Sequence, residues 1–221
     1  MDTESFGKGA DATKAVAETV GKALDQTAGF MKALESPFRH LLGIYDDRIQ
    51  HRRWKNQILL IEDAQEFMKE RGLAKLTREI PLKFGVPLVE NATLEDDEDL
   101  RKIWARLLVN AGDASTPMEP RPAYVKILSS MSSMDVKLLA QLVEASLAGP
   151  PGFRRAIDVG KMLNGEAGGA TGADLPPDVG VSLANLASLG CAMPGGGFDA
   201  AVIFGYMTVT ELGIALYKAC S

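Results

Sequence analysis

The chain has 221 residues, of which 46% are hydrophobic and 24% are charged, and its formal net charge is −5 at pH 7. This length can bury a core and form one or two domains, and the composition is typical of a soluble globular protein. The negative balance disfavours binding of nucleic acid or an anionic membrane by the molecule as a whole. No apolar run approaches the roughly 18–20 residues that cross a bilayer.

The N-terminus and the cysteines indicate the compartment. Asp2 and Glu4 precede Lys8, a polar start that differs from a secretory signal. The two cysteines, Cys191 and Cys220, cannot build a disulfide framework. We therefore expect a cytoplasmic protein.

Residues 1–35 predict an N-terminal amphipathic helix or arm. Within residues 10–34, apolar and small side chains recur every three or four positions, the period of one helical face. This segment could be an ordinary helix, a partner-binding arm or an interfacial membrane helix. Its apolar face is largely small and its polar face is balanced rather than basic, which favours the ordinary helix.

A second helical region begins at Ser36 and Pro37, a capping residue followed by proline at the first helical position. It ends at Gly72. Between residues 50 and 57 the apolar stripe thins to Trp54 alone. The region is therefore predicted to be either one long helix or two helices joined at this point.

The stretch around Trp54 is the one concentrated basic patch of the sequence, and it also contains His51. The residues of a possible polyanion-binding site are Arg48, Arg52, Arg53, Trp54 and Lys55. In this interpretation the arginines contact phosphate and Trp54 stacks on a base. The alternative is a solvated helix face whose arginines pair with Asp46, Asp47 or the acidic run at 95–99. Charge runs on helices favour this alternative.

A short helix is predicted from Pro81 to Asn91, with Pro87 expected to kink it or end it early. Thr93 is the expected cap of the next helix, and Asp96 stands three residues on, as in a variant capping box. The acidic run at 95–99 would stabilise the positive end of the helix dipole. A divalent-cation site is the less favoured role, because the run lacks the alternating ligands and central glycine of a calcium loop.

The buried face of this helix is predicted from large apolar residues three or four positions apart, with Trp104 as a structural anchor. These residues are Leu100, Ile103, Trp104, Leu107 and Leu108. Gly112 ends the helix. Residues 36–115 thus predict a helical subdomain, and a proline-containing linker at 113–122 marks its boundary.

Residues 120–221 predict a second subdomain, which begins with helices at 123–131 and 133–148. Ser133 is the expected cap of the second helix, and its apolar face comprises Val136, Leu139, Leu142, Val143 and Leu147. A short helix over 154–163 and a Gly/Ala-rich loop at 165–177 follow.

The last 45 residues predict a helix over 179–189, a glycine-rich turn and a strand with Val202, Phe204 and Tyr206 on one face. Thr208 or Thr210 caps a final helix. Helices, then a hairpin, then a helix is the layout of a winged helix-turn-helix. The predicted fold class is mainly α, a helical bundle followed by a winged-helix-like unit with one small β-hairpin around 191–207.

A winged helix usually binds DNA, but the charges of this one argue against it. The segment in the recognition position, residues 179–189, contains no lysine or arginine. From residue 176 onwards Lys218 is the only basic side chain, against Asp178, Asp199 and Glu211. A DNA-binding protein must neutralise several phosphates. Nucleic acid is therefore a disfavoured partner, and the wing is expected to pack or to bind protein.

Four blocks in order carry a resemblance to a known family. The blocks read NATLEDDEDLRKIWARLLVNAGD, YVKILSSMSSMDVKLLAQL, LANLASLGCAM and YMTVTELGIALYKAC. They resemble successive blocks of the Abi-alpha (abortive infection alpha) domain family over about residues 37–221. The matching positions lie at 94–108, 127–139, 185–190 and 210–220. The resemblance implies a bacterial, phage-associated protein with a role in phage exclusion, and it supplies no catalytic residue.

The inventory of reactive residues points to a protein that is not an enzyme. His40, His51, Cys191 and Cys220 have no recognisable zinc spacing, and no catalytic or dinucleotide-binding motif is present. Both cysteines are expected in the core. We predict no catalytic residue, metal or cofactor.

The expected function is that of an interaction protein in phage defence, which binds another protein or itself. Two alternatives stay open. One is a nucleic-acid-binding regulator that uses the basic patch, and the other is a membrane-acting effector that uses residues 10–34.

Overall fold

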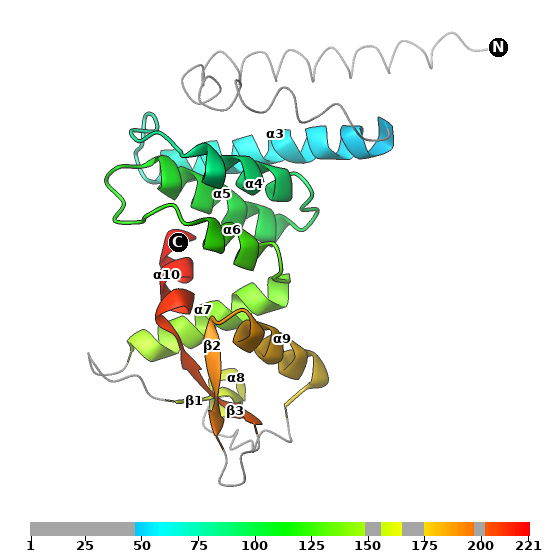
Figure 1. The fold of residues 1–221 in the computed structure, drawn as a ribbon, viewed down its shortest axis with the longest axis vertical. Coiled ribbons are helices and arrows are strands. Elements are labelled where there is room, and N and C mark those ends of the chain that lie inside the picture. Colours follow the sequence, from blue (N-terminus) through cyan, green and yellow to red (C-terminus); the bar gives the residue numbers. More distant parts are fainter. Residues whose placement is uncertain (1–46, 149–155, 165–174, 197–201) are drawn as a thin grey trace, which may run out of the picture.

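The computed structural model describes residues 47–148, 156–164, 175–196 and 202–221. They form a mostly helical protein with a small antiparallel sheet, as predicted (Figure 1). The elements in chain order are α3 (Asp47–Glu70), α4 (Leu82–Ala92), α5 (Glu98–Gly112), α6 (Pro122–Leu128), α7 (Ser133–Leu147), β1 (Ile157–Asp158), α8 (Val159–Asn164), α9 (Pro177–Ser188), β2 (Ala192–Gly196), β3 (Val202–Val209) and α10 (Glu211–Ala219). The helix or arm predicted for residues 1–35 lies outside the described residues.

Figure 1 shows two layers joined by a waist. Helices α3, α4, α5 and α6 form the upper part, and α7 with α8, α9 and the sheet forms the lower part. Helix α10 returns from the sheet to contact α5 and α7. The buried residues form one continuous apolar cluster through both parts. The division into subdomains at 36–115 and 120–221 stays a prediction.

Helix α5 lies at the centre of the core. Trp104 is 1% exposed, and Leu107 and Leu108 are fully buried. Leu100 is buried as well, whereas Ile103 is half-buried. The face predicted from the three-and-four spacing is therefore confirmed. It contacts α3, α4, α7 and α10, which explains why its largest side chains are apolar.

Helix α3 runs without a break through the basic stretch, so the alternative of two joined helices is wrong for residues from Asp47 onwards. It ends before Gly72, whose φ of 68° suits glycine. Pro87 lies inside α4 and does not end it. Proline removes one backbone donor, and packing of Phe84 and Leu88 in the core sustains the helix around it.

Two predicted helix caps were wrong in position. Thr93 ends α4, and Asp97 caps α5 by accepting a hydrogen bond from the backbone N–H of Leu100 at 2.9 Å. Ser132, not Ser133, caps α7 in a capping box with Asp135. Neighbouring Ser, Thr and Asp residues are all competent caps, and the direction in which each helix packs decides among them. The last helix, α10, is capped by Thr210, one of the two predicted residues.

The sheet has three strands in the order β1-β3-β2, all antiparallel. The predicted hairpin is β2–β3, with Met193 opposite Thr208. Strand β1 was not predicted. Ile157 and Asp158 pair with Met207 and Tyr206, so α8 begins at Val159 rather than near residue 154. A two-residue strand is too short to show alternation.

The face of β3 that carries Phe204 and Tyr206 is the more exposed one. Met207 and Val209 are buried, whereas Tyr206 is 43% exposed and Phe204 half-buried. The period of two was predicted correctly, but both faces carry apolar residues, so the sequence pattern could not tell which faces the core. Leu147 of α7, expected in its apolar face, is likewise exposed. The winged-helix-like assignment stays a prediction.

Candidate interaction surfaces

The basic stretch of α3 faces the turn between α4 and α5. Nη1 of Arg52 lies 3.7 Å from Oδ2 of Asp96, and both side chains are exposed. The guanidinium of Arg53 donates to Oγ1 of Thr93 at 3.3 Å and to the backbone oxygen of Glu90 at 3.4 Å. Pairing of Arg52 with the acidic run at 95–99 agrees with the solvated-face alternative. An exposed ion pair of this kind contributes little stability.

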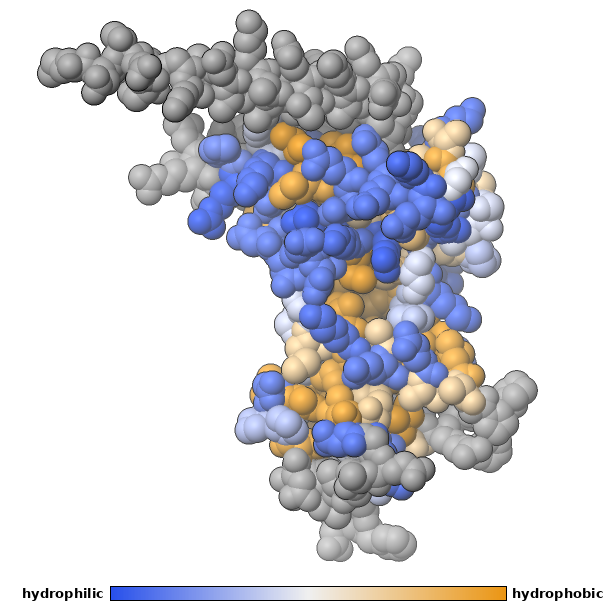
Figure 2. Space-filling model, turned by 180° about the vertical axis from the view of Figure 1, so that it is seen from behind, coloured by the Kyte–Doolittle hydropathy of each residue, from blue (hydrophilic) through white to orange (hydrophobic). Residues whose placement is uncertain are grey.

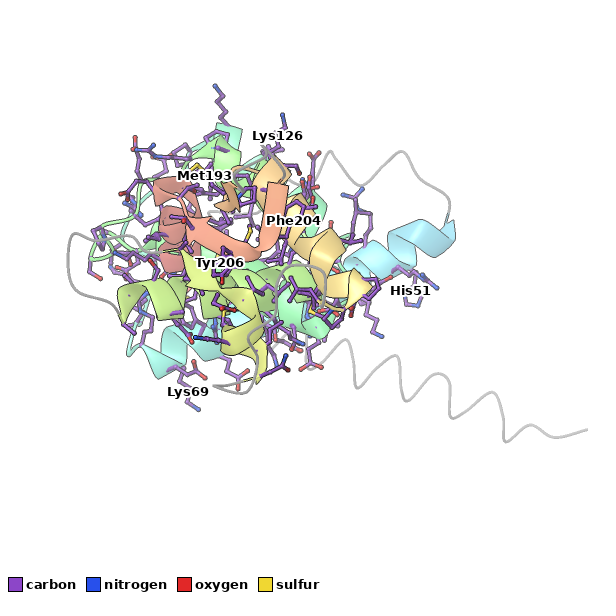
Figure 3. All side chains as sticks on the ribbon, turned by 90° about the horizontal axis from the view of Figure 1, so that it is seen from below. His51, Lys69, Lys126, Met193, Phe204 and Tyr206 are labelled. Atoms are coloured by element: carbon purple, nitrogen blue, oxygen red, sulfur yellow. The ribbon has the colours of Figure 1, made fainter. Side chains whose placement is uncertain are left out.

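Trp54 remains open to solvent on this helix. It is 46% exposed, and its ring centroid lies 6.5 Å from that of His51, which projects outward from α3 (Figure 3). Lys55 is exposed, and the side chain of Arg48 lies outside the described residues. Polyanion binding by this stretch stays a prediction.

A groove at the waist, which the sequence did not indicate, lies between α5 and α7 and extends to α10. It consists of two adjoining cavities of about 320 and 300 Å³. Both are lined by Ile103 and Arg106 of α5 and by Val136 and Ala140 of α7. We call these two joined cavities the waist groove. Figure 2 shows apolar side chains at the waist, below the largely hydrophilic surface of the upper helices.

Arg106 lies where the two cavities meet. Its guanidinium carbon is 5.5 Å from the centre of the Phe67 ring, a cation–π contact. A smaller recess on the α3 side of Arg106 is lined by Glu66 and Glu70. Within the described part of the chain, Arg106 has no carboxylate within ion-pair distance. Asp63, which also lines that recess, already pairs with Arg101 at 2.7 Å.

One of the two cavities of the waist groove is also lined by side chains of α7 and α10. The hydroxyl of Tyr217 donates to Oε1 of Glu144 at 3.1 Å, and Cys220 lines the same cavity. Burial raises the pKa of Cys220 to about 12 and that of Cys191 to about 11. Both cysteines are buried, as predicted, and both thiols are protonated at neutral pH.

The lower part exposes apolar side chains and few charges. Val181 of α9 is 70% exposed, and Met193 of β2 is 56% exposed. Figure 3 shows Met193, Phe204 and Tyr206 around the β2–β3 pair on the underside of the molecule. Asp178 is the one charged residue of α9. We call the exposed residues Met193 and Tyr206 of the sheet, together with the exposed Val181 of α9, the helix that contacts β2, the underside surface.

Two further findings concern the described ranges only. No helix there is long and apolar enough to cross a membrane. Nor do three or more His, Cys, Asp or Glu side chains gather there in a way that could hold a metal ion.

Comparison with known proteins assigns the family. A family model described as abortive infection alpha matches residues 55–220, about three quarters of the chain. The chain belongs to the abortive infection alpha family. No curated protein and no solved structure matches it. The family name associates the chain with abortive infection, a defence against phage. The match begins at Lys55, so the rest of the basic stretch lies outside it.

Residues from the family's blocks join separate elements of the fold. Asn185, in the third block, donates from Nδ2 to Oδ2 of Asp135 at 3.0 Å and to the backbone oxygen of Ser130 at 2.9 Å. The same Asp135 oxygen accepts the backbone N–H of Ser132 at 2.6 Å. Thr210, in the fourth block, donates to the backbone oxygen of Gly190 at 2.6 Å. These block residues therefore hold α7, α9 and α10 in place.

Asn185→Ala should lower the free energy of unfolding by about 1–2 kcal/mol, because it removes a hydrogen bond to a charged carboxylate. Ser188→Ala is the matched control, since Ser188 makes only local bonds on the same helix. Urea denaturation of both variants measures the difference. Equal stability of the two would show that the bond between α9 and α7 contributes nothing.

Proposed function

We propose that this chain acts in abortive infection as an interaction protein, which binds another protein or a second copy of itself and catalyses no reaction. The observation that supports this most is the underside surface. Val181, Met193 and Tyr206 expose large apolar side chains there, and such surfaces favour protein partners. The family membership supplies the association with phage defence.

The charge of the lower part favours protein over nucleic acid as the partner. Helix α9 carries no basic residue, and between residues 176 and 221 Lys218 is the only one. Neutralising several phosphates requires several cations. The rival function, nucleic-acid binding through the basic stretch of α3, is favoured only by the exposure of Trp54 and Lys55. Salt-dependent retention on heparin or RNA would separate the two functions.

The test places a charge on the underside surface. In bacteria that express the chain, Val181→Glu and Met193→Glu should abolish protection against phage in a plaque assay, because a charge at an apolar contact must be desolvated. Their melting temperatures should stay close to that of the parent, since exposed substitutions usually change stability by less than about 0.5 kcal/mol.

Leu94→Glu is the matched control, because Leu94 is 60% exposed in the upper part, away from the underside surface. This variant should protect like the parent. The proposal fails if both underside variants protect fully, or if the parent protects against no phage in a broad panel.

A further inference from the structure

The waist groove has the chemistry of a small-ligand site. Its walls are aliphatic over most of their area and come from α5, α7 and α10, with Ile103, Val136, Leu139 and Leu216 among them. Its two cavities, of about 320 and 300 Å³, lie at the lower end of the range for small-molecule sites, which starts near 300 Å³. Such sites combine apolar walls with a few polar groups that orient the ligand.

The polar group at the centre of the groove is a cation. Arg106 lines both cavities, and the ring of Phe67 lies on one side of its guanidinium. The other charged groups that line the groove are already engaged. Lys137 pairs with Asp99 at 2.9 Å, Lys102 pairs with Glu98 at 2.6 Å, and Glu144 accepts the hydroxyl of Tyr217.

Arg106 can therefore still form an ion pair with a bound anion. Among the described residues, Glu66 and Glu70 line the adjoining recess, and neither forms an ion pair with Arg106. A guanidinium donates two parallel hydrogen bonds to a carboxylate, and a planar acid group can accept them in the plane of the guanidinium without displacing the Phe67 ring.

We propose that the waist groove binds a small aliphatic carboxylate, with its hydrocarbon chain between α5 and α7 and its acid group on Arg106. The size of the groove supports this ligand over a peptide helix. On α5 the lining runs from Asp99 to Arg106, eight residues that span about 10 Å of helix. That length suits a medium-length hydrocarbon chain. A long peptide helix would extend past both ends of the groove. This site lies outside the proposed function, which does not depend on it.

The test uses octanoate and decanoate as probes of the full chain, with calorimetric titration and thermal unfolding as readouts. Decanoate should bind and raise the melting temperature, and decanol should bind more weakly. Arg106→Gln should weaken decanoate binding by about tenfold or more, because a charge-assisted hydrogen bond is lost, while decanol binding stays unchanged. Arg121→Gln, an exposed arginine paired with Glu119 elsewhere, is the matched control and should bind like the parent.

Ala140→Phe provides a second, steric variant. Ala140 lines both cavities, so the added ring should fill the groove and abolish binding of decanoate and decanol alike. The proposal is wrong if the parent binds neither octanoate nor decanoate at millimolar concentration. That result would favour a side chain of a bound peptide as the occupant of the groove. It is equally wrong if Arg106→Gln binds decanoate as tightly as Arg121→Gln does.

Discussion

Trp104→Ala should produce the largest loss of stability of any single substitution in the upper helices. Trp104 is 1% exposed and lies on α5 between Leu100 and Leu108 in the centre of the core. Truncating a buried tryptophan costs about 3–5 kcal/mol, a large part of the roughly 5–15 kcal/mol that stabilises a domain. For a chain of this length the melting temperature should fall by roughly 6–20 °C. Protection against phage should fall with it, through loss of folded protein.

Trp54→Ala is the matched control, because it removes the same side chain from an exposed position of α3. Its melting temperature should stay close to that of the parent. Thermal unfolding by circular dichroism measures both variants. A Trp104→Ala protein that melts like the parent yet loses function would make Trp104 a contact residue and contradict its role as a structural anchor.

Gly213→Ala should be the most damaging substitution in the lower part. A Cβ atom at residue 213, in the first turn of α10, would lie 2.1 Å from the backbone oxygen of Cys191. That oxygen also accepts the backbone N–H of Thr210 at 3.0 Å, so it cannot move away without breaking the start of α10. Overpacking typically costs about 1–3 kcal/mol and occasionally more. Because the contact is with backbone, we expect a loss of about 3 kcal/mol, measured by urea denaturation.

Gly180→Ala separates this clash from the general effect of replacing a helical glycine. Gly180 lies in α9, and a Cβ atom there would meet nothing within 4 Å. Alanine is the better helix former by about 0.8–1 kcal/mol, so this variant should equal or exceed the parent in stability. If Gly213→Ala were as stable as Gly180→Ala, the close packing of α10 on the turn at Cys191 would be wrong.

Local patterns in the sequence predicted the centre of the fold correctly. The spacing of Leu100, Trp104, Leu107 and Leu108 indicated the buried face of α5, since only one face of a helix can pack on the core. The four ordered blocks indicated the family, which the match over residues 55–220 confirms. The block residues Asn185, Asp135 and Thr210 connect elements of the fold, so a block can identify the family without indicating a binding site.

Candidate sites depend less on local sequence patterns than helices do. The basic stretch around Trp54 could be found in the sequence because its charged residues lie close together on one helix. The pairing of Arg52 with the acidic run was one of the alternatives considered for it. The waist groove could not be predicted from the sequence. Its lining comes from positions at helical spacing on α5 and α7 that are separated by about 30 residues, and only their packing brings Arg106 near Val136 and Ala140.

What the sequence determined by itself was therefore the helical class, the identity of the central helix and the family, because each depends on short-range periodicity or on residues in order. The tertiary structure alone decided which of several caps is used, which face of β3 is buried and that Ile157 and Asp158 form a strand. It also decided where a groove opens. These features depend on contacts between segments far apart in the chain, and each segment taken singly is compatible with more than one arrangement.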